Sequence, residues 1–283
     1  PWQSGSDGQE ETQAVNLNPR SQRWVPDNSY LQRHVGSAIA HNVWQYFQVT
    51  HDVEFLHSYG AELILDIACF WSSIASFNDG RGRYEIRGVM GPDEFHDGYP
   101  DSSTSGLNNN AYTNLMAVWV LCRALEVLDL ISDMRRSELT TRLDLSSEEI
   151  ARWADISRRM FVPFHEDGII SQFEGYEKLR ELDWEEYRTR YGNIQRLDLI
   201  LEGENDSANF YKLSKQADVL MLFYLFSAEE IGELFERLDY PFEYETIPRN
   251  ITYYLDRSSH GSTLCRVVHA WVLARSDRPR AMD

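Results

Sequence analysis

Two adjacent carboxylates, Asp93 and Glu94, lie in a polar loop and could act as acid–base groups. Gly91–Pro92 comes directly before them and forces a turn that places both carboxylates at its tip. A glutamate walled by ring side chains would be poorly solvated, and poor solvation favours the protonated form that a general acid needs. The alternative is an ordinary Asx-rich turn with solvated carboxylates. Ring side chains that could wall the tip stand at Phe95, His96, Tyr99 and Tyr112.

Three consecutive asparagines, Asn108–Asn109–Asn110, close the same loop. Their side chains are costly to desolvate unless they are hydrogen-bonded. At a helix start they can cap the helix, and they can also bind sugar hydroxyls or orient the acid. The loop therefore combines a candidate acid with candidate sugar-binding groups.

A second segment, Ser259–His260–Gly261–Ser262–Thr263, precedes an amphipathic helix and could hold an anion. Free backbone N–H groups at a helix N-terminus, a flexible glycine and two hydroxyls bind anions without net positive charge. His260 could add a proton donor. The alternative is an ordinary Ser/Thr N-cap.

Helical periodicity dominates the elements that must position these groups. The spacing predicts little strand, apart from 84–87 and 168–172. Long polar loops are predicted over 80–105, 166–203 and 240–260, and loops of this length in a compact domain are commonly functional. Paired helices with chemistry in the loops predict an all-α toroid or another helical array. The predicted helices cover residues 31–49, 53–77, 110–131, 147–161, 207–226, 228–238 and 262–274.

The composition is that of a globular protein and excludes some partners. A formal net charge of −18 argues against nucleic acid or an anionic membrane surface, because both select basic patches. No uninterrupted apolar run is long enough to cross a bilayer. Three separated cysteines and the absence of metal-ligand spacing indicate free thiols in a reducing compartment, so we expect a cytoplasmic protein.

The loop that carries Asp93 and Glu94, called the acid loop below, resembles that of glycoside hydrolase family 65. This family comprises the maltose, kojibiose and trehalose phosphorylases and their relatives. The family pattern is Gly-Pro-Asp-Glu-Tyr/Phe-His, then Asn-Asn-Ala-Tyr-Thr-Asn at the next helix, and it matches 91–96 and 109–114. The resemblance extends over nearly the whole chain. It implies an (α/α)6 barrel, a ring of six helical hairpins. It also implies that Glu94 is the general acid and that Asp93 orients or tunes it.

The resemblance also implies binding residues. The pair Lys215–Gln216 matches the family pair that holds the transferred glucosyl unit. Trp2–Gln3 and Val25 fall in the acceptor subsite, where the family has Trp-Glu and, in kojibiose phosphorylases, Thr. These departures leave the acceptor open. The family binds phosphate with His-Gly-Ser-Thr/Ser-Leu, which here matches His260, Gly261, Ser262, Thr263 and Leu264.

The implied reaction is inverting phosphorolysis of an α-glucosyl disaccharide or glucoside to β-glucose 1-phosphate and a free acceptor. Inorganic phosphate is the co-substrate and is already a nucleophile, so no catalytic base, metal or organic cofactor is expected. One alternative is a hydrolase of the same family, like a trehalase or a kojibiose hydrolase, which would need a base near the phosphate segment. Another is a non-catalytic helical carbohydrate-binding protein, which would not need Glu94.

Residues 1–283 are expected to form the central and C-terminal part of the barrel domain. The family's N-terminal β-sandwich and C-terminal β-domain lie outside them. Alone, such a chain is expected to expose an apolar edge and to show little activity. The full-length protein is expected to form a homodimer.

Overall fold

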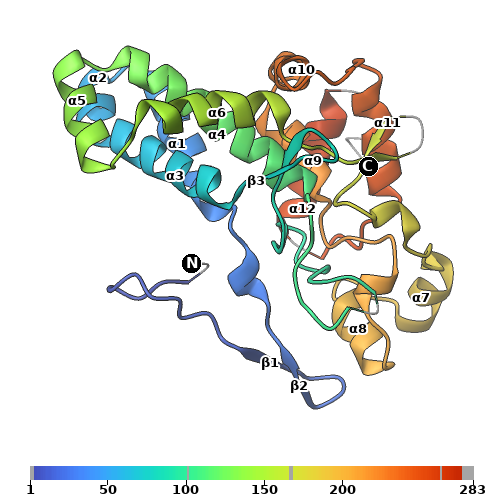
Figure 1. The fold of residues 1–283 in the computed structure, drawn as a ribbon. Coiled ribbons are helices and arrows are strands. Elements are labelled where there is room, and N and C mark those ends of the chain that lie inside the picture. The colour runs from blue at the N-terminus through green and yellow to red at the C-terminus, as the bar shows by residue number, and fades with distance from the viewer. Residues whose placement is uncertain (1–2, 101, 166–167, 262, 276–283) are drawn as a thin grey trace.

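The computed structural model describes residues 3–100, 102–165, 168–261 and 263–275. Helices are its main elements, which confirms the predicted all-α class (Figure 1). The α-helices are α1 (Val35–Thr50), α2 (Val53–Phe55), α3 (Ala61–Ile74), α4 (Ala111–Leu130), α5 (Asp133–Arg142), α6 (Ser147–Arg159), α7 (Trp184–Tyr191), α8 (Leu197–Gly203), α9 (Asp218–Leu225), α10 (Ala228–Arg237), α11 (Thr246–Leu255) and α12 (Thr263–Ala274). A π-helical turn, η2 (Leu56–Gly60), joins α2 to α3, and the 3-10 turns are η1 (Ser29–Leu31), η3 (Tyr176–Lys178) and η4 (Ala208–Phe210).

Helix α4 is the centre of the main core. It contacts α1, α3, α6 and α9, and every side chain from Ala111 to Leu121 is buried. A helix that is apolar on all sides needs neighbours on all sides. By length and composition α4 could also cross a membrane, but 78% of its apolar window is buried inside the protein, as in a core helix.

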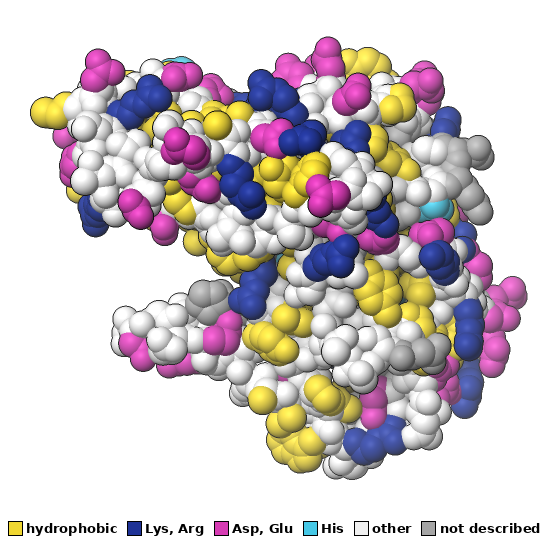
Figure 2. Space-filling view, viewed as in Figure 1, with side chains coloured by type: hydrophobic (Ala, Val, Ile, Leu, Met, Phe, Trp, Pro, Cys, Tyr) yellow, Lys and Arg dark blue, Asp and Glu magenta, His cyan; other side chains and the backbone are white. Residues whose placement is uncertain are grey.

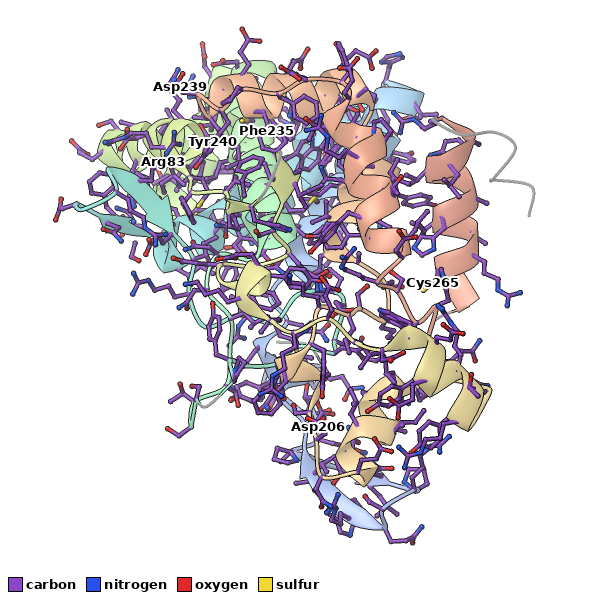
Figure 3. All side chains as sticks on the ribbon, turned by 90° about the vertical axis from the view of Figure 1, so that its right-hand side faces the viewer. Arg83, Asp206, Phe235, Asp239, Tyr240 and Cys265 are labelled. Atoms are coloured by element: carbon purple, nitrogen blue, oxygen red, sulfur yellow. The ribbon has the colours of Figure 1, made fainter. Side chains whose placement is uncertain are left out.

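The C-terminal helices pack around α9. This short helix contacts α4, α10, α11 and α12, so it joins both halves of the main core. Helix α10 begins with a capping box in which Ser227 and Glu230 satisfy each other's backbone N–H groups. The hairpin of residues 76–85 holds the end of α10. There the Arg83 guanidinium donates to the Leu238 carbonyl at 2.9 Å and lies over the Tyr240 ring (Figure 3).

In the described part of the chain, three short antiparallel hairpins accompany the helices. The two predicted strand segments, 84–87 and 168–172, overlap β4 and β6, whereas the β1–β2 hairpin was not predicted. The hairpins are β1 (Val15–Asn18) with β2 (Arg23–Pro26), β3 (Ser76–Asn78) with β4 (Arg83–Glu85), and β5 (Phe164–His165) with β6 (Ile169–Ile170).

The predicted loops 166–203 and 240–260 were wrong in part, because they contain α7, α8 and α11. Helices α7 and α8 have only eight and seven residues, so a 3.6-residue period has little length in which to show. The predicted helix 207–226 is α-helical only from Asp218. Its first half is extended apart from η4, because those residues pair with other loops.

A second, smaller core lies under α7 and α8. We call residues 182–213 the small lobe; it lies below the main helical body in Figure 1. Phe95 from the acid loop packs into this core, so the acid loop is clamped between the two parts. The buried apolar residues of the second core are Phe95, Leu182, Ile194, Leu197, Ile200, Leu201, Ala208 and Leu213.

One face of the α1–α3 region is apolar and exposed. Val49 is 79% exposed, Tyr59 66% and Val53 60%. Figure 2 shows hydrophobic side chains at the surface of the molecule among mixed charges. Apolar side chains exposed together in this way are typical of a surface that another part of a protein covers.

Candidate active site

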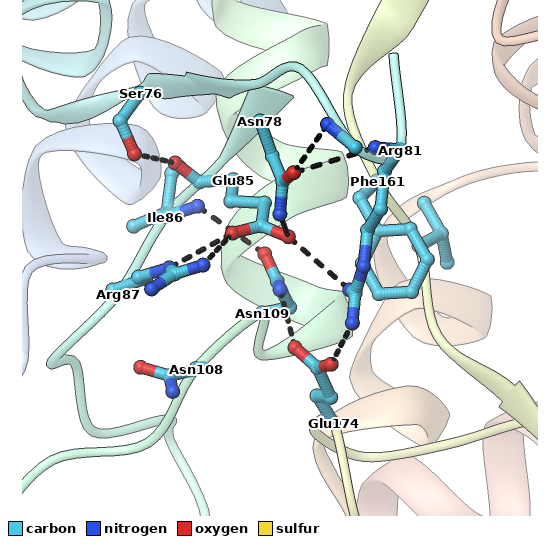
Figure 4. A network of polar contacts seen from close by, with 12 residues as sticks. Ser76, Asn78, Arg81, Glu85, Ile86, Arg87, Asn108, Asn109, Phe161 and Glu174 are labelled. Atoms are coloured by element: carbon cyan, nitrogen blue, oxygen red, sulfur yellow. Dashed lines mark hydrogen bonds and ion pairs between the residues drawn. The ribbon is translucent and has the colours of Figure 1, made fainter. Parts of the chain in front are cut away.

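The acid loop, residues 86–110, is closed at its base by paired backbone. Val89 and Leu107 exchange both backbone hydrogen bonds, at 3.0 and 2.7 Å, and the Asn109 N–H donates to the Ile86 carbonyl at 2.8 Å. A polar network supports this base from behind (Figure 4). In it, the Asn109 side chain donates to Glu174 at 2.8 Å and accepts from the Ile86 N–H at 3.3 Å.

The same network neutralises a buried carboxylate. Glu85 is 1% exposed and accepts from Arg87 Nε at 2.8 Å and from Asn78 at 2.9 Å, with Arg81 at 3.2 Å. Arg81 also pairs with Glu174 and lies 4.4 Å from the centre of the Phe161 ring. Because a buried carboxylate needs charged or hydrogen-bonding partners, these arginines and Asn78 stabilise Glu85 at the base of the loop.

Asp93 is a buried hub, not a solvated turn residue. It is 1% exposed, and its Oδ1 accepts the Lys215 backbone N–H at 2.6 Å. Its Oδ2 lies 3.1 Å from both Gln172 Nε2 and His96 Nδ1. The other ring nitrogen of His96 donates to the Tyr211 carbonyl at 2.9 Å. Asp93 thus ties the acid loop directly to two distant segments of the chain, at Gln172 and Lys215.

Glu94 differs from Asp93 in its exposure, in its ion pair and in its backbone conformation. Its side chain is 37% exposed, and its carboxylate forms an ion pair with Lys215 Nζ at 2.5 Å. Its φ is +67°, a left-handed conformation that costs an ordinary residue about 1 to 2 kcal/mol. Such strain persists only where the surroundings enforce it and is common at functional sites.

The predicted apolar enclosure of Glu94 is not what the structure shows. Phe95 and His96 are buried on the other side of the loop, in the second core and against the Phe173 ring. Tyr99 and Tyr112 belong to the main core. Glu94 instead lines an open cleft, together with Met90 and Asp97 of the same loop.

That cleft has a volume of about 450 Å³ and lies between the acid loop, the β1–β2 hairpin and the small lobe. Hydrogen bonds hold the hairpin there, including Asn18 Nδ2 to the Leu199 carbonyl at 2.9 Å, and Val25 lines the cleft. Its cations are Lys215, which pairs with Glu94, and Arg196, which pairs with Asp198 at 2.7 Å. The carboxylates among its lining residues are Asp27, Glu94, Asp97, Asp198, Glu202 and Asp206.

The predicted phosphate segment lies directly beside Lys215. The Ser259 N–H donates to the Ser214 carbonyl at 2.8 Å, and the Gly261 N–H donates to the Lys215 carbonyl at 3.3 Å. Any Cβ at Gly261 would overlap the Gln195 carbonyl oxygen and lie 2.9 Å from Lys215 Cγ, so glycine is required for this approach. Figure 3 shows Cys265, in the first turn of α12, above the small lobe that carries Asp206.

His260 has a left-handed backbone, with φ +55°, and no hydrogen-bond partner for its Nδ1 in the described structure. Burial lowers its pKa, and the positive charges of Arg188 and Arg266 lower it further. Its ring lies 4.9 Å from that of His269, whose own pKa burial lowers to about 4. His260 therefore lies in a locally positive environment, which favours an anion.

Not every predicted site residue is placed. Trp2 and Ser262 lie outside the described residues, as does the side chain of Thr263, whose backbone begins α12. Gln216 Oε1 accepts from Cys265 Sγ at 3.7 Å. Gln3 is exposed, its N–H donates to Glu10 at 3.1 Å, and it does not line the cleft.

The structure also adds residues that the sequence did not single out. Gln172, Arg188 and Arg196 come from segments that carried no motif. Asp218 follows the Lys215–Gln216 pair by two positions, but only tertiary contact shows that it reaches the acid loop.

The whole chain, residues 1–283, matches the model of the glycosyl hydrolase family 65 central catalytic domain. This chain belongs to glycoside hydrolase family 65. It is 59% identical over its full length to an uncharacterized glycosyl hydrolase of Mycobacterium tuberculosis, of which it covers 21%. It is 38% identical, again over its full length, to the trehalose 6-phosphate phosphorylase of Lactococcus lactis, of which it covers 35%.

A kojibiose phosphorylase of Halothermothrix orenii is 31% identical over 95% of this chain, which covers 32% of that protein. A solved structure of a human-microbiome protein, named provisionally as a kojibiose phosphorylase, superposes with a TM-score of 0.69 at 21% identity. It matches 87% of this chain and 33% of that one, and it confirms the family's (α/α)6 barrel fold. The chain thus spans about a third or less of the length of these relatives.

Proposed function

We propose that the protein containing this chain is an inverting phosphorylase of α-glucosides. Glu94 donates a proton to the glycosidic oxygen as the bond from that oxygen to the anomeric carbon breaks. A phosphate oxygen attacks the same carbon from the opposite face, on a cradle formed by His260, Gly261, Ser262 and Thr263. The products are β-glucose 1-phosphate and the free acceptor, and neither a metal nor an organic cofactor takes part.

One observation carries this proposal: backbone hydrogen bonds between residues 214–215 and 259–261 bring the segment proposed to bind phosphate next to Lys215, which pairs with Glu94. An acid and a nucleophile on opposite sides of one sugar need such an adjacency. The phosphorylases among the relatives support the same reaction class.

The ion pair of Glu94 with Lys215 is the resting arrangement. A glucosyl unit bound by Lys215 and Gln216 draws the ammonium onto sugar hydroxyls and away from the carboxylate. Loss of that partner frees the Glu94 carboxyl to meet the glycosidic oxygen. Substrate binding and the release of Glu94 are thereby coupled through one lysine.

A hydrolase would need a second carboxylate that activates water. Asp93 and Asp218 are each 1% exposed and accept hydrogen bonds from protein N–H groups, so neither has room for a water nucleophile. This excludes Asp93 and Asp218 as that base.

The acceptor is a sugar or polyol, and two classes of it deserve a direct comparison. The kojibiose phosphorylase relatives favour a neutral glucose acceptor, and the trehalose 6-phosphate phosphorylase favours glucose 6-phosphate. Arg196 is the cation in the cleft that could meet an acceptor phosphate once it is released from Asp198.

The test uses the full-length protein with trehalose, kojibiose, maltose, nigerose and trehalose 6-phosphate, each with and without inorganic phosphate. Glucose 1-phosphate and free glucose are measured side by side. We expect phosphate-dependent β-glucose 1-phosphate, abolished in Glu94→Gln and retained in Glu236→Gln, a change at an exposed carboxylate of α10. Glucose released equally without phosphate would make the protein a hydrolase and refute the proposal.

A further inference from the structure

Asp218, the first residue of α9, places a fully buried carboxylate directly beneath the acid loop. Its Oδ1 accepts the Asp93 backbone N–H at 2.6 Å, and its Oδ2 accepts from Asn110 Nδ2 at 2.6 Å. The other side-chain atom of Asn110, Oδ1, caps α4 by accepting the Thr113 N–H at 2.9 Å. One carboxylate therefore joins the N-terminal ends of two core helices to the residue before Glu94.

The acid loop is shaped to fit this carboxylate. A Cβ at Gly91 would overlap both Asp218 Oδ2 and Asn110 Nδ2, so the backbone approaches the carboxylate as only glycine permits. In the opposite direction, the Asp93 carboxylate accepts the Lys215 N–H at 2.6 Å. Residues 91–93 and 215–218 thus exchange hydrogen bonds in both directions.

This clamp has a direct geometric link to the proposed acid. Glu94 follows Asp93 with φ +67°, and its carboxylate meets the side chain of Lys215, whose backbone is on the other side of the clamp. A shift of the loop relative to α9 would change the distance from Glu94 to both Lys215 and the bound glycosidic oxygen. Positioning errors of about 1 Å commonly lower turnover by about 100-fold.

We propose that Asp218 is a positioning residue that locks the acid loop onto α9 and α4 and so aims Glu94 at the glycosidic oxygen. This inference rests on the proposed role of Glu94 as the acid. A buried carboxylate is a poor choice for stability alone, because an apolar residue would avoid its desolvation. Burial, and then the charge of Asp93, raise the pKa of Asp218 well above its ordinary value. The directed hydrogen bonds are what an apolar residue could not supply.

The experiment exchanges the two partners in the full-length protein. In Asp218→Asn, the new amide can still accept from the Asp93 N–H, but its NH₂ group opposes the NH₂ group of Asn110. Adding Asn110→Asp restores a donor facing an acceptor and keeps a good helix cap. We expect kcat for phosphorolysis to fall about 100-fold in Asp218→Asn with KM for the glucoside within about threefold, and to recover at least about tenfold in the double variant.

The comparison separates the inference from the function on which it rests. If the unchanged protein shows no phosphorolysis, the proposed function fails and this inference fails with it. If the unchanged protein is active, the inference is overturned by a kcat in Asp218→Asn within twofold of it, or by a double variant no better than the single one. Should Asp218→Asn not fold, Asn110→Ser keeps a cap oxygen but withdraws the donor from Asp218, because the serine side chain is shorter, and an unaltered kcat there would equally refute the role.

Discussion

The close approach at Gly261 offers the sharpest test of how the phosphate segment is held. In Gly261→Ala the new Cβ would lie 2.9 Å from Lys215 Cγ, where ordinary contacts begin at 3.4 Å, and it would overlap the Gln195 carbonyl oxygen more severely. The Lys215 side chain can turn away, but the Gln195 carbonyl cannot, so the two backbones must separate by about 1 Å there, from 2.4 Å to 3.4 Å. The obstacle at Gln195 is backbone, so no side-chain rotation can relieve it.

A displacement approaching 1 Å between phosphate and the bound sugar predicts a loss of about 100-fold in kcat/KM for phosphate. Affinity for the glucoside should change much less, because Glu94 and Lys215 stay paired. The assay is initial-rate phosphorolysis by the full-length protein with phosphate varied at saturating glucoside. Gly36→Ala is the matched control: Gly36 lies in α1, and its Cβ would make an ordinary 3.5 Å contact with Ile67 of α3. A Gly261→Ala enzyme with unaltered kcat/KM for phosphate would refute the adjacency.

Three further predictions concern binding, pH and the isolated chain. Lys215→Met should raise KM for the glucoside at least about tenfold, yet change the free energy of unfolding by less than about 1 kcal/mol, because the ion pair with Glu94 is partly exposed; urea titration beside the rate assay checks both. Burial lowers the pKa of His34 from 6.5 to about 4, so the unfolded chain binds a proton that the folded chain rejects. Stability is full above pH 6.5 and should fall by about 2 kcal/mol between pH 7 and pH 5, a decline that His34→Asn should flatten in pH-dependent denaturation. The 283-residue chain alone should self-associate through its exposed face around Val49 and Tyr59 and be nearly inactive, whereas a monomeric, fully active preparation in sedimentation and rate measurements would contradict this.

Helices whose signals lie within a short stretch of sequence could be predicted. Residues 110–131 and 147–161 were expected as helices and are α4 and α6, within a few residues at each end. Their starts carry explicit caps, Asn110 for α4 and Ser146 for α6, and a cap is a local hydrogen bond within a few residues. Periodicity and caps act over one or two turns, so the order of amino acids already contains them.

Helices α5, α7, α8 and α11 were missed. Helix α5 carries a local cap at Ser132, so a local signal for it was present, whereas α7 and α8 are short and α7 buries none of its residues fully. The small lobe is stabilised by a separate core to which Phe95 contributes across nearly ninety positions of sequence. No window of local sequence contains such a contact.

The acid loop shows the same division between features set by local sequence and features set by distant contacts. By itself, the sequence determined a turn at Gly91–Pro92 with two carboxylates at its tip, and the family motifs around it. Only the tertiary structure decided that Asp93 is buried while Glu94 opens to a cleft. The hydrogen-bond donors that hold the Asp93 carboxylate come from Gln172 and Lys215, which are distant in sequence. Residues separated by 121 positions, Glu94 and Lys215, meet because α4 and α9 pack in one core. Residue types and their spacing set which chemistry is available, and long-range packing decides which groups share a site and which of them reach solvent.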